Sequence, residues 1–352
     1  MSQSQAFINR LIQNQKRLEE LLDRFVSQPV LVIGDLTLDE FLTGQVERIS
    51  REAPVLILRH EETRQIPGGG ANAVYNLAKL GAQVKVVGIV GEDSQGEALL
   101  DIFGKAGIDN TGVIKTKDRP TVTKTRIAGH ARQSVTQQIV RVDRKSDELP
   151  SIEIQNQLAE FIKQELASVQ AIVCSDYGDG VFTPTVIEAC LQGDRATARH
   201  RRDRVIVDTQ KDLARYLGAT LFTPNLPEAE QAVGYAINNA PSLEKAGEDL
   251  LKLTKASHML ITRGEEGMSL FEQGKVEHIP AFNRTDVFDV TGAGDTVVAA
   301  LTLALAAGGS FWEAAVLGNL AASIVVRQFG TATTSVEEMK SALVKFLEQN
   351  IT

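Results

Sequence analysis

The feature that most constrains the fold is a series of short, strongly apolar runs separated by longer segments with helical spacing. The runs are rich in Val, Ile and Leu and occupy residues 30–34, 84–90, 171–174, 204–207, 220–222 and 258–262. Apolar runs of this length are typical of strands buried on both faces, and their alternation with helices predicts a parallel sheet covered on both sides. A chain of 352 residues, 43% of them hydrophobic, can bury the core that one such α/β domain requires.

The first 28 residues differ from the rest of the chain. Apolar side chains recur there at helical spacing among Gln, Arg and Glu, at Phe7, Ile8, Leu11, Ile12, Leu18, Leu21, Leu22 and Phe25. This pattern predicts one or two amphipathic helices that pack on the domain or on a second subunit. Pro29 ends the pattern, so we expect a helical extension over residues 1–28 and the main domain over residues 29–352.

A Gly-rich turn near the C-terminus is the first sign of chemistry. The β-prone residues Val287, Phe288 and Val290 lead into Thr-Gly-Ala-Gly-Asp-Thr, and the apolar segment 297–307 then reads as a buried helix. Backbone N–H groups of Gly292, Ala293 and Gly294 would converge at the helix N-terminus and bind an anion. Asp295 would place a base for an acceptor hydroxyl beside it, which suits phosphoryl transfer. A tight turn with Asp295 as helix cap is the alternative.

A second Gly-rich segment, Pro67–Ala78, combines three glycines at positions 68–70 with Asn72 and an amphipathic helix. In order and separation, the two segments resemble the signatures of the ribokinase-like (PfkB) sugar kinases, from about Val30 to about Phe346. The resemblance implies a three-layer α/β sandwich with a mostly parallel central sheet. It also implies that the β-rich segments 46–62 and 120–143 form a small sheet that covers the sugar as a lid and joins a homodimer. The alternative for these segments is a pair of surface hairpins.

Further segments resemble the D-glycero-D-manno-heptose-7-phosphate kinases of the ADP-heptose pathway. They are residues 34–39, 51–55, 123–126, 175–178 and 223–228. Many of these kinases continue into a fused nucleotidyltransferase domain, whereas this sequence ends at Thr352, so we expect a stand-alone kinase. The implied reaction is ATP-dependent phosphorylation of the anomeric hydroxyl of heptose 7-phosphate to the 1,7-bisphosphate.

The resemblance assigns roles on the substrate side. Asp35 and Asp39 would accept hydrogen bonds from sugar hydroxyls, beside Gly68, Gly69, Gly70 and Asn72. The presumed lid carries three cations for a terminal phosphate, Lys124, Arg126 and Arg141. Alternatively, one Asp forms a turn and the cations belong to a solvated strand face.

On the nucleotide side, the resemblance places Asn225 and Glu228 near Mg²⁺ and its waters; the alternative is that the two residues cap a helix. The other implied ATP-binding residues are Thr262, Arg263, Gly264, Gly267, Asn319 and Ser323. A monovalent cation such as K⁺ would bind near Asp289 and Thr291.

Three departures from the heptose-kinase pattern bear on the choice of sugar. Asp179 stands where these kinases carry Lys, and Asp208-Thr209-Gln210-Lys211 replaces Asp-Pro-Lys. Residues 195–204 also contain five arginines. The alternatives are therefore a kinase of the same family for ribose, fructose or a nucleoside such as adenosine, and a sugar-binding regulator without turnover. The intact Asp295 and its two glycines argue against the regulator.

Composition limits the possible partners and the cellular compartment of the protein. A net charge of −8 disfavours nucleic acid as a partner, and no apolar run is long enough to span a membrane. The N-terminus lacks the features of a signal peptide. Cys174 and Cys190 form neither a disulfide framework nor a zinc-binding spacing, which is typical of a reducing cytoplasm.

Overall fold

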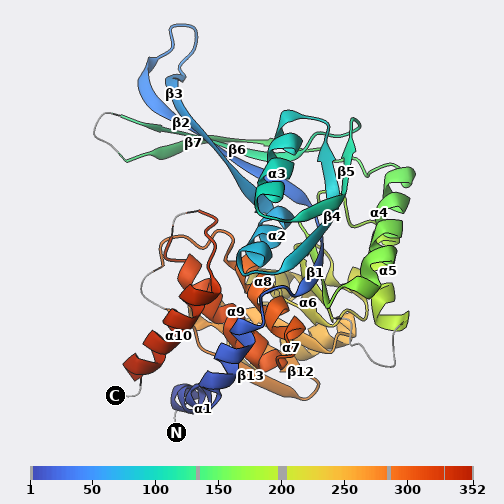
Figure 1. The fold of residues 1–352 in the computed structure, drawn as a ribbon. Coiled ribbons are helices and arrows are strands. Elements are labelled where there is room, and N and C mark those ends of the chain that lie inside the picture. Colours follow the sequence, from blue (N-terminus) through green and yellow to red (C-terminus); the bar gives the residue numbers. More distant parts are fainter. Residues whose placement is uncertain (1–2, 132–134, 197–203, 284–286, 329, 351–352) are drawn as a thin grey trace.

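The computed structural model describes residues 3–131, 135–196, 204–283, 287–328 and 330–350 (Figure 1). Its main sheet has nine strands in the order β13-β12-β11-β10-β9-β8-β1-β4-β5. Their bounds are β1 Pro29–Gly34, β4 Gln83–Gly91, β5 Asp109–Thr116, β8 Ala171–Asp176, β9 Arg204–Thr209, β10 Leu221–Phe222, β11 His258–Thr262, β12 Met268–Glu272 and β13 Lys275–Ile279. All neighbours are parallel except β11–β12 and β12–β13. The six predicted strands are confirmed, and β5, β12 and β13 are additional.

Helices cover both faces of this sheet, which confirms the predicted three-layer sandwich (Figure 1). Alternate residues of β1 point to opposite layers: Val30 and Val32 join one core, and Leu31 and Ile33 join the other. The first layer contains α1 Gln3–Asp23, α2 Gly70–Lys79, α3 Ser94–Lys105, α8 Ala293–Ala306, α9 Phe311–Val325 and α10 Val336–Asn350. The second contains α4 Ile152–Glu165, α5 Pro184–Ala196, α6 Leu226–Val233 and α7 Ala240–Thr254. Short 3₁₀ turns occupy Leu166–Ser168, Leu213–Tyr216 and Gly264–Glu266.

The N-terminal segment forms one helix, α1, that packs on the domain. Leu11, Leu18, Leu21 and Leu22 are fully buried in the first layer, and α1 lies against α10. The Phe7 ring makes an edge contact with Phe282, with ring centroids 6.0 Å apart. The apolar stripe of this helix is therefore covered within one chain.

A four-stranded sheet in the order β3-β2-β6-β7 projects from the body (Figure 1). Its strands are β2 Leu36–Ile49, β3 Leu56–Gly69, β6 Val122–His130 and β7 Gln137–Arg144. β2 pairs antiparallel with β3 and parallel with β6, so the two β-rich segments form one sheet rather than separate hairpins. The first segment extends beyond its predicted bounds of 46–62, because β2 starts directly after β1 and β3 runs into α2. β6 and β7 together span 122–144, close to the predicted 120–143.

One predicted strand is wrong. Residues 287–290, expected to lead into the Gly-rich turn as a strand, form an irregular segment. The side chains of Val287, Phe288 and Val290 are 49%, 71% and 67% exposed, so they lie outside the core that would favour a strand. The Phe288 and Asp289 amides instead donate to the Val326 carbonyl, which ties this segment to the end of α9.

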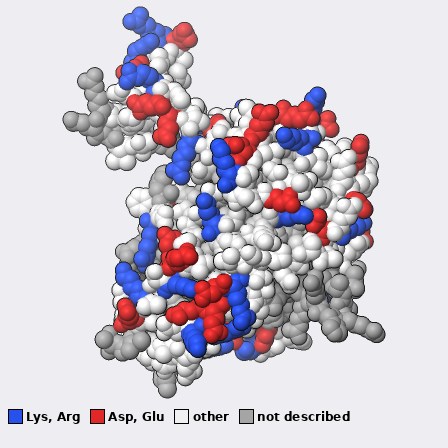
Figure 2. Space-filling model, viewed as in Figure 1, with Lys and Arg blue, Asp and Glu red and all other residues white. Residues whose placement is uncertain are grey.

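The Arg-rich stretch 195–204 falls largely outside the described residues. Among the described residues, no helix is both long and apolar enough to cross a membrane. Figure 2 shows acidic and basic side chains interspersed over the face drawn, including the projecting sheet.

Candidate active site

Asp295 lies in the first turn of α8, and its carboxylate is held from two sides. Asn72 Nδ2 donates to Oδ2 at 2.7 Å, and the Tyr177 hydroxyl donates to Oδ1 at 3.0 Å. Burial raises the pKa of Asp295 to about 6, although both hydrogen bonds act to lower it. The carboxylate is therefore mostly ionised at neutral pH and still basic enough to accept a proton.

A buried polar network joins α2 to α8 behind this carboxylate. Asn76 Nδ2 donates to the main-chain carbonyl and to Oδ1 of Asn72, at 2.9 and 3.1 Å. The Thr296 hydroxyl donates to Asn76 Oδ1 at 3.0 Å. The network fixes the rotamer of Asn72 and with it the direction of Asp295. Sequence reasoning missed Asn76 and Thr296, and the available signal was the spacing of four between two Asn residues on one helix.

The turn before α8 leaves open space for an anion. Gly292 has φ +77°, and a Cβ atom there would lie 2.6 Å from Asn72 Nδ2. The Ala293 amide donates to the Val290 carbonyl, so one of the three predicted donors is already engaged. A Cβ atom on Gly294 would have no atom within 4 Å from the described residues outside its own helix turn. The space over Gly294, at the positive end of the helix dipole, is where an anion can approach.

Glycines 68–70 let three elements meet closely. A Cβ atom on Gly68 would lie 2.6 Å from Asp39 Oδ2, and one on Gly70 would lie 2.9 Å from the Cα atom of Gly34. Gly69 has φ +50° and precedes α2. These glycines therefore bring the start of α2, with Asn72, against the ends of β1 and β2.

Two of the three predicted lid cations reach this cleft. Arg126 Nη1 lies 2.8 Å from Asp39 Oδ1, and both side chains are largely buried. Lys124 is close enough to Asp295 for its charge to act against the raised pKa of that carboxyl, and its Nζ lies 5.6 Å from the Tyr177 ring centroid. Arg141 lies opposite Arg126 on β7, but it is half exposed and pairs with Asp143.

Asp35 does not occupy the sugar-contacting position that the resemblance implied. Its carboxylate accepts hydrogen bonds from the amides of Tyr177, Asp179 and Val181 at 2.9–3.0 Å, and the residue is 1% exposed. Burial raises the pKa of Asp35 to about 6 despite these bonds. Asp35 therefore positions the loop that carries Tyr177, and Asp39 is the aspartate that faces the cleft.

The departures from the heptose-kinase pattern meet in that same loop. The Asp179 carboxylate lies 3.7 Å from Lys145 Nζ, and its carbonyl accepts a hydrogen bond from Arg119. Lys211 lies over Gly178, because a Cβ atom on that glycine would come within 1.8 Å of Lys211 Cε. Cations therefore still lie beside this loop, although Asp179 replaces the lysine of the family pattern. Lys211, the lysine over Gly178, comes from the segment after β9.

Carboxylates also gather where β9 and β10 end. Burial raises the pKa of Asp208 to about 8, and the charges of Asp295 and Glu228 add to the effect. Asn225 and Glu228 cap α6 reciprocally: Asn225 Oδ1 accepts from the Glu228 amide, and the Glu228 carboxylate accepts from the Asn225 amide. Sequence reasoning missed Asp208, whose signal is its place at the carboxyl end of a buried strand.

The predicted ATP turn follows β11. Thr262 forms an isolated bridge with Asn225, which links this turn to the acidic group. Arg263 Nη1 donates to Glu266 at 2.6 Å and closes the turn. Gly264 and Gly267 have φ +57° and +89°, backbone conformations that other residues rarely adopt.

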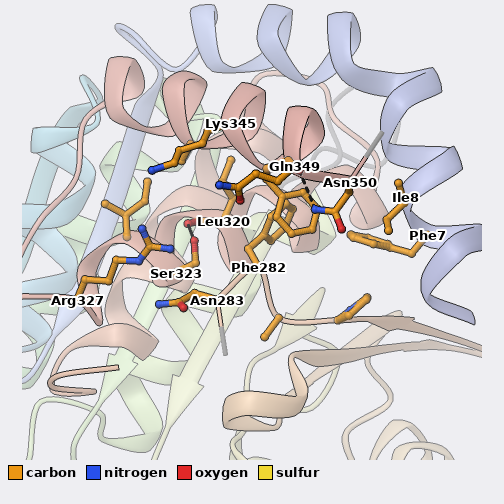
Figure 3. A pocket seen from close by; sticks show the side chains of 15 residues that line it. Phe7, Ile8, Phe282, Asn283, Leu320, Ser323, Arg327, Lys345, Gln349 and Asn350 are labelled. Carbon is orange, nitrogen blue, oxygen red and sulfur yellow. Dashed lines mark hydrogen bonds between the residues drawn. The ribbon is translucent and has the colours of Figure 1, made fainter. Parts of the chain in front are cut away.

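A pocket of about 460 Å³ lies between α1, α9, α10 and the segment after β13 (Figure 3). Arg327, Ser323 and Asn283 lie at one end of it, and Phe7 and Ile8 of α1 lie at the other (Figure 3). Ser323 is one of the lining residues. Asn319 lies behind the lining, where its Nδ2 donates a hydrogen bond to the Pro280 carbonyl.

Asp289 ties two loops together. It accepts hydrogen bonds from the amides of Thr291 and Gly330, each at 2.9 Å. Burial acts to raise the pKa of Asp289, but these bonds outweigh it and the pKa is lowered. Among the described residues, no three His, Cys, Asp or Glu side chains converge as metal ligands.

Comparisons with known proteins assign the chain to a family. The model of the pfkB family of carbohydrate kinases matches residues 28–339. Among curated relatives, the bifunctional protein HldE of Geobacter metallireducens is 45% identical over 92% of this chain, and that of Pelobacter propionicus is 43% identical over 94%. The chain spans 64% and 66% of these relatives' lengths.

Solved structures show the same fold at low sequence identity. Phosphofructokinase-2 from Escherichia coli in complex with potassium superposes with a TM-score of 0.70 at 18% identity, over 91% of this chain and 99% of the enzyme. Arabidopsis thaliana ribokinase complexed with ribose and ATP gives 0.66 at 20% identity, over 92% and 99%. With the family model covering most of the domain, this chain belongs to the pfkB family of carbohydrate kinases and is an ATP-dependent sugar kinase.

Proposed function

We propose that the enzyme transfers the γ-phosphoryl group of ATP to the anomeric hydroxyl of D-glycero-D-manno-heptose 7-phosphate, giving the 1,7-bisphosphate and ADP. The observation that carries the proposal is Asp295, a buried carboxylate at the first turn of α8 that lies within reach of the charge of Lys124. Arg126 lies in the same cleft, paired with Asp39. A neutral sugar needs no such cations, whereas a phosphorylated acceptor does. The motifs that resemble heptose-7-phosphate kinases support the choice of acceptor.

In this mechanism the acceptor hydroxyl gives its proton to Asp295 as its oxygen attacks the γ-phosphorus. The bond from that phosphorus to the bridging oxygen breaks, and ADP leaves. The free space over Gly294 and the dipole of α8 accommodate the negative charge of the transferring group. Asn72 and Tyr177 hold the carboxylate in position throughout.

The acidic group at the ends of β9 and β10 fits Mg²⁺. The carboxylates of Asp208, Glu228 and Asp295 lie close enough to raise the pKa of Asp208, so a divalent cation there would relieve their repulsion. Asp208, Asn225 and Glu228 would hold the metal, largely through water, and Mg²⁺ would supply positive charge to the phosphates of ATP. Asp289 and Thr291 are the proposed site of a monovalent cation such as K⁺.

The pocket of Figure 3 is the proposed site of the adenine ring. It has the size of a small-molecule site and combines aromatic side chains with a polar end at Arg327, Ser323 and Asn283. Thr262, Arg263, Gly264 and Gly267 would lie along the phosphates. In this assignment α1 supplies one wall, through Phe7 and Ile8.

We also propose a cytoplasmic homodimer that forms through the projecting sheet. β7 is an edge strand, and its Ile139, Val140 and Val142 are 43–52% exposed. An edge strand with exposed apolar side chains favours pairing with another copy of itself.

The direct test is kcat/KM over a panel of acceptors with Mg·ATP. Heptose 7-phosphate should exceed ribose, fructose and adenosine by about 10²-fold, because a neutral acceptor lacks the charge-assisted contacts that a phosphate would make with the lid cations. ³¹P NMR should place the new phosphate on the anomeric carbon. A preference for a neutral sugar, or transfer to another position, would reject the heptose proposal and leave the kinase assignment intact.

The pH dependence of the rate tests the role of Asp295. Since a base acts unprotonated, kcat/KM should fall about tenfold per unit as the pH drops below about 6, the pKa of Asp295. Tyr177→Phe removes a hydrogen bond that lowers this pKa, so the fall should begin at higher pH. Tyr75→Phe, on α2, is the matched control.

Asp35 would titrate in the same range, because burial also raises its pKa to about 6. Its hydrogen bonds come from main-chain amides, which Tyr177→Phe leaves in place. If the acid limb of the pH profile does not move in Tyr177→Phe, the loss of activity at low pH therefore arises from a group other than Asp295.

A further inference from the structure

Another pocket, of about 570 Å³, lies between β3, α2, α3 and the loop that follows α9. Its charged lining residues are Arg64, Lys79 and Lys105, and no lining residue is acidic. A lining of one sign is unexpected in a chain whose net charge is −8. Figure 2 shows basic side chains at the junction of the projecting sheet and the body, where these elements meet.

Two of the three cations have no carboxylate partner among the residues that the structure describes. Lys105 pairs with Asp101 one turn earlier on α3, at 2.6 Å. Arg64 and Lys79 form no ion pair with any residue that the structure describes, and Lys79 Nζ lies 5.0 Å from the Tyr75 ring centroid. Both can therefore bind an anion without first breaking a salt bridge.

The pocket also contains uncharged hydrogen-bonding groups. Thr331 Oγ1 is buried and has no hydrogen-bond partner among the described residues. A hydroxyl left in this state costs free energy, and an oxygen of a bound ligand would satisfy it. Asn72, which holds Asp295 at 2.7 Å, also lines the pocket, so the pocket adjoins the catalytic base.

We propose that this pocket binds a small phosphorylated metabolite, with its phosphate between Arg64 and Lys79. The site differs from the adenine pocket of Figure 3 and from the acceptor cleft at Asp39, because it shares no cation with either. Its volume exceeds that of a phosphate ion and suits an organic phosphate ester. Apolar groups such as Ile66 and Ile102 would contact the carbon part of the ligand.

The test is to titrate the full chain, in the absence of ATP, with inorganic phosphate and, separately, with ribose 5-phosphate. Binding is measured by calorimetry and by ³¹P NMR. Arg64→Gln/Lys79→Gln should weaken binding of both probes about 10- to 100-fold, as expected for loss of charge-assisted hydrogen bonds. Lys115→Gln/Lys163→Gln removes two exposed charges elsewhere and should leave binding unchanged. Tighter binding of ribose 5-phosphate than of phosphate would identify an organic phosphate as the preferred ligand.

A second variant separates this pocket from the acceptor cleft. Lys124→Gln alters the cleft beside Asp295, so phosphate binding at the new pocket should survive it. Unchanged affinity in Arg64→Gln/Lys79→Gln, or loss of affinity in Lys124→Gln alone, would overturn the proposal. Thermal unfolding of each variant checks that the fold is retained.

Discussion

Replacing Asp295 by Asn is expected to lower kcat by about 10²- to 10⁴-fold, the range attributed to general-base catalysis. The amide nearly matches the carboxylate in shape, so the α8 turn and the binding of ATP and sugar should be retained. It cannot accept the proton of the acceptor hydroxyl. Release of ADP measures kcat, and calorimetric titration with ATP and with the acceptor measures binding.

Asp39→Asn is the matched control, because Asp39 is a second buried carboxylate in the same cleft. It pairs with Arg126 at 2.8 Å rather than with the network around Asn72. Its replacement should raise KM for the acceptor more than it lowers kcat. Near-normal turnover in Asp295→Asn would falsify the assignment of Asp295 as base, and equal kcat losses in both variants would indicate a general loss of charge in the cleft.

The main sheet could be predicted because buried parallel strands leave continuous apolar runs in a sequence. β10, with two residues, was still recognised, since Leu221 and Phe222 stand between helical segments. The edge hairpin β12–β13 was missed because its strands are short and partly polar. The strand predicted at 287–290 failed for the opposite reason: its residues favour strands locally, but they are largely exposed and belong to neither sheet of the described residues.

In the site, too, residues could be predicted where their own segment carries the signal, and not where the fold brings them together. Asp295 and Asn72 could be proposed from their own segments, because each adjoins a Gly-rich helix start. The Tyr177 hydroxyl could not, since it reaches Asp295 from a loop 118 residues away in the chain. Asp35 and Asp39 are four residues apart and look alike in sequence. Only the fold distinguishes the aspartate that binds backbone amides from the one that faces the cleft.

Gly292→Ala is expected to lower kcat by about 10²- to 10³-fold. This is the range found when an enzyme loses one group that stabilises charge in the transition state. At φ +77° a side chain is strained, and the new Cβ atom would lie 2.6 Å from Asn72 Nδ2. Asn72 must then move, which breaks its 2.7 Å hydrogen bond to Asp295. The pKa of Asp295 would rise further, because that bond acts to lower it. Both kcat and the acid limb of the pH profile report the change.

Gly294→Ala separates the geometry of the turn from the space above it. Its Cβ atom would meet nothing within 4 Å, and its backbone does not require glycine, so the unfolding temperature should match that of the wild type. Since that space is where the transferring phosphoryl group would lie, we expect KM for ATP to rise and kcat to fall, by less than in Gly292→Ala. Full activity in Gly294→Ala would show that the phosphoryl group lies elsewhere. Full activity in Gly292→Ala would show that the bond from Asn72 is dispensable for catalysis.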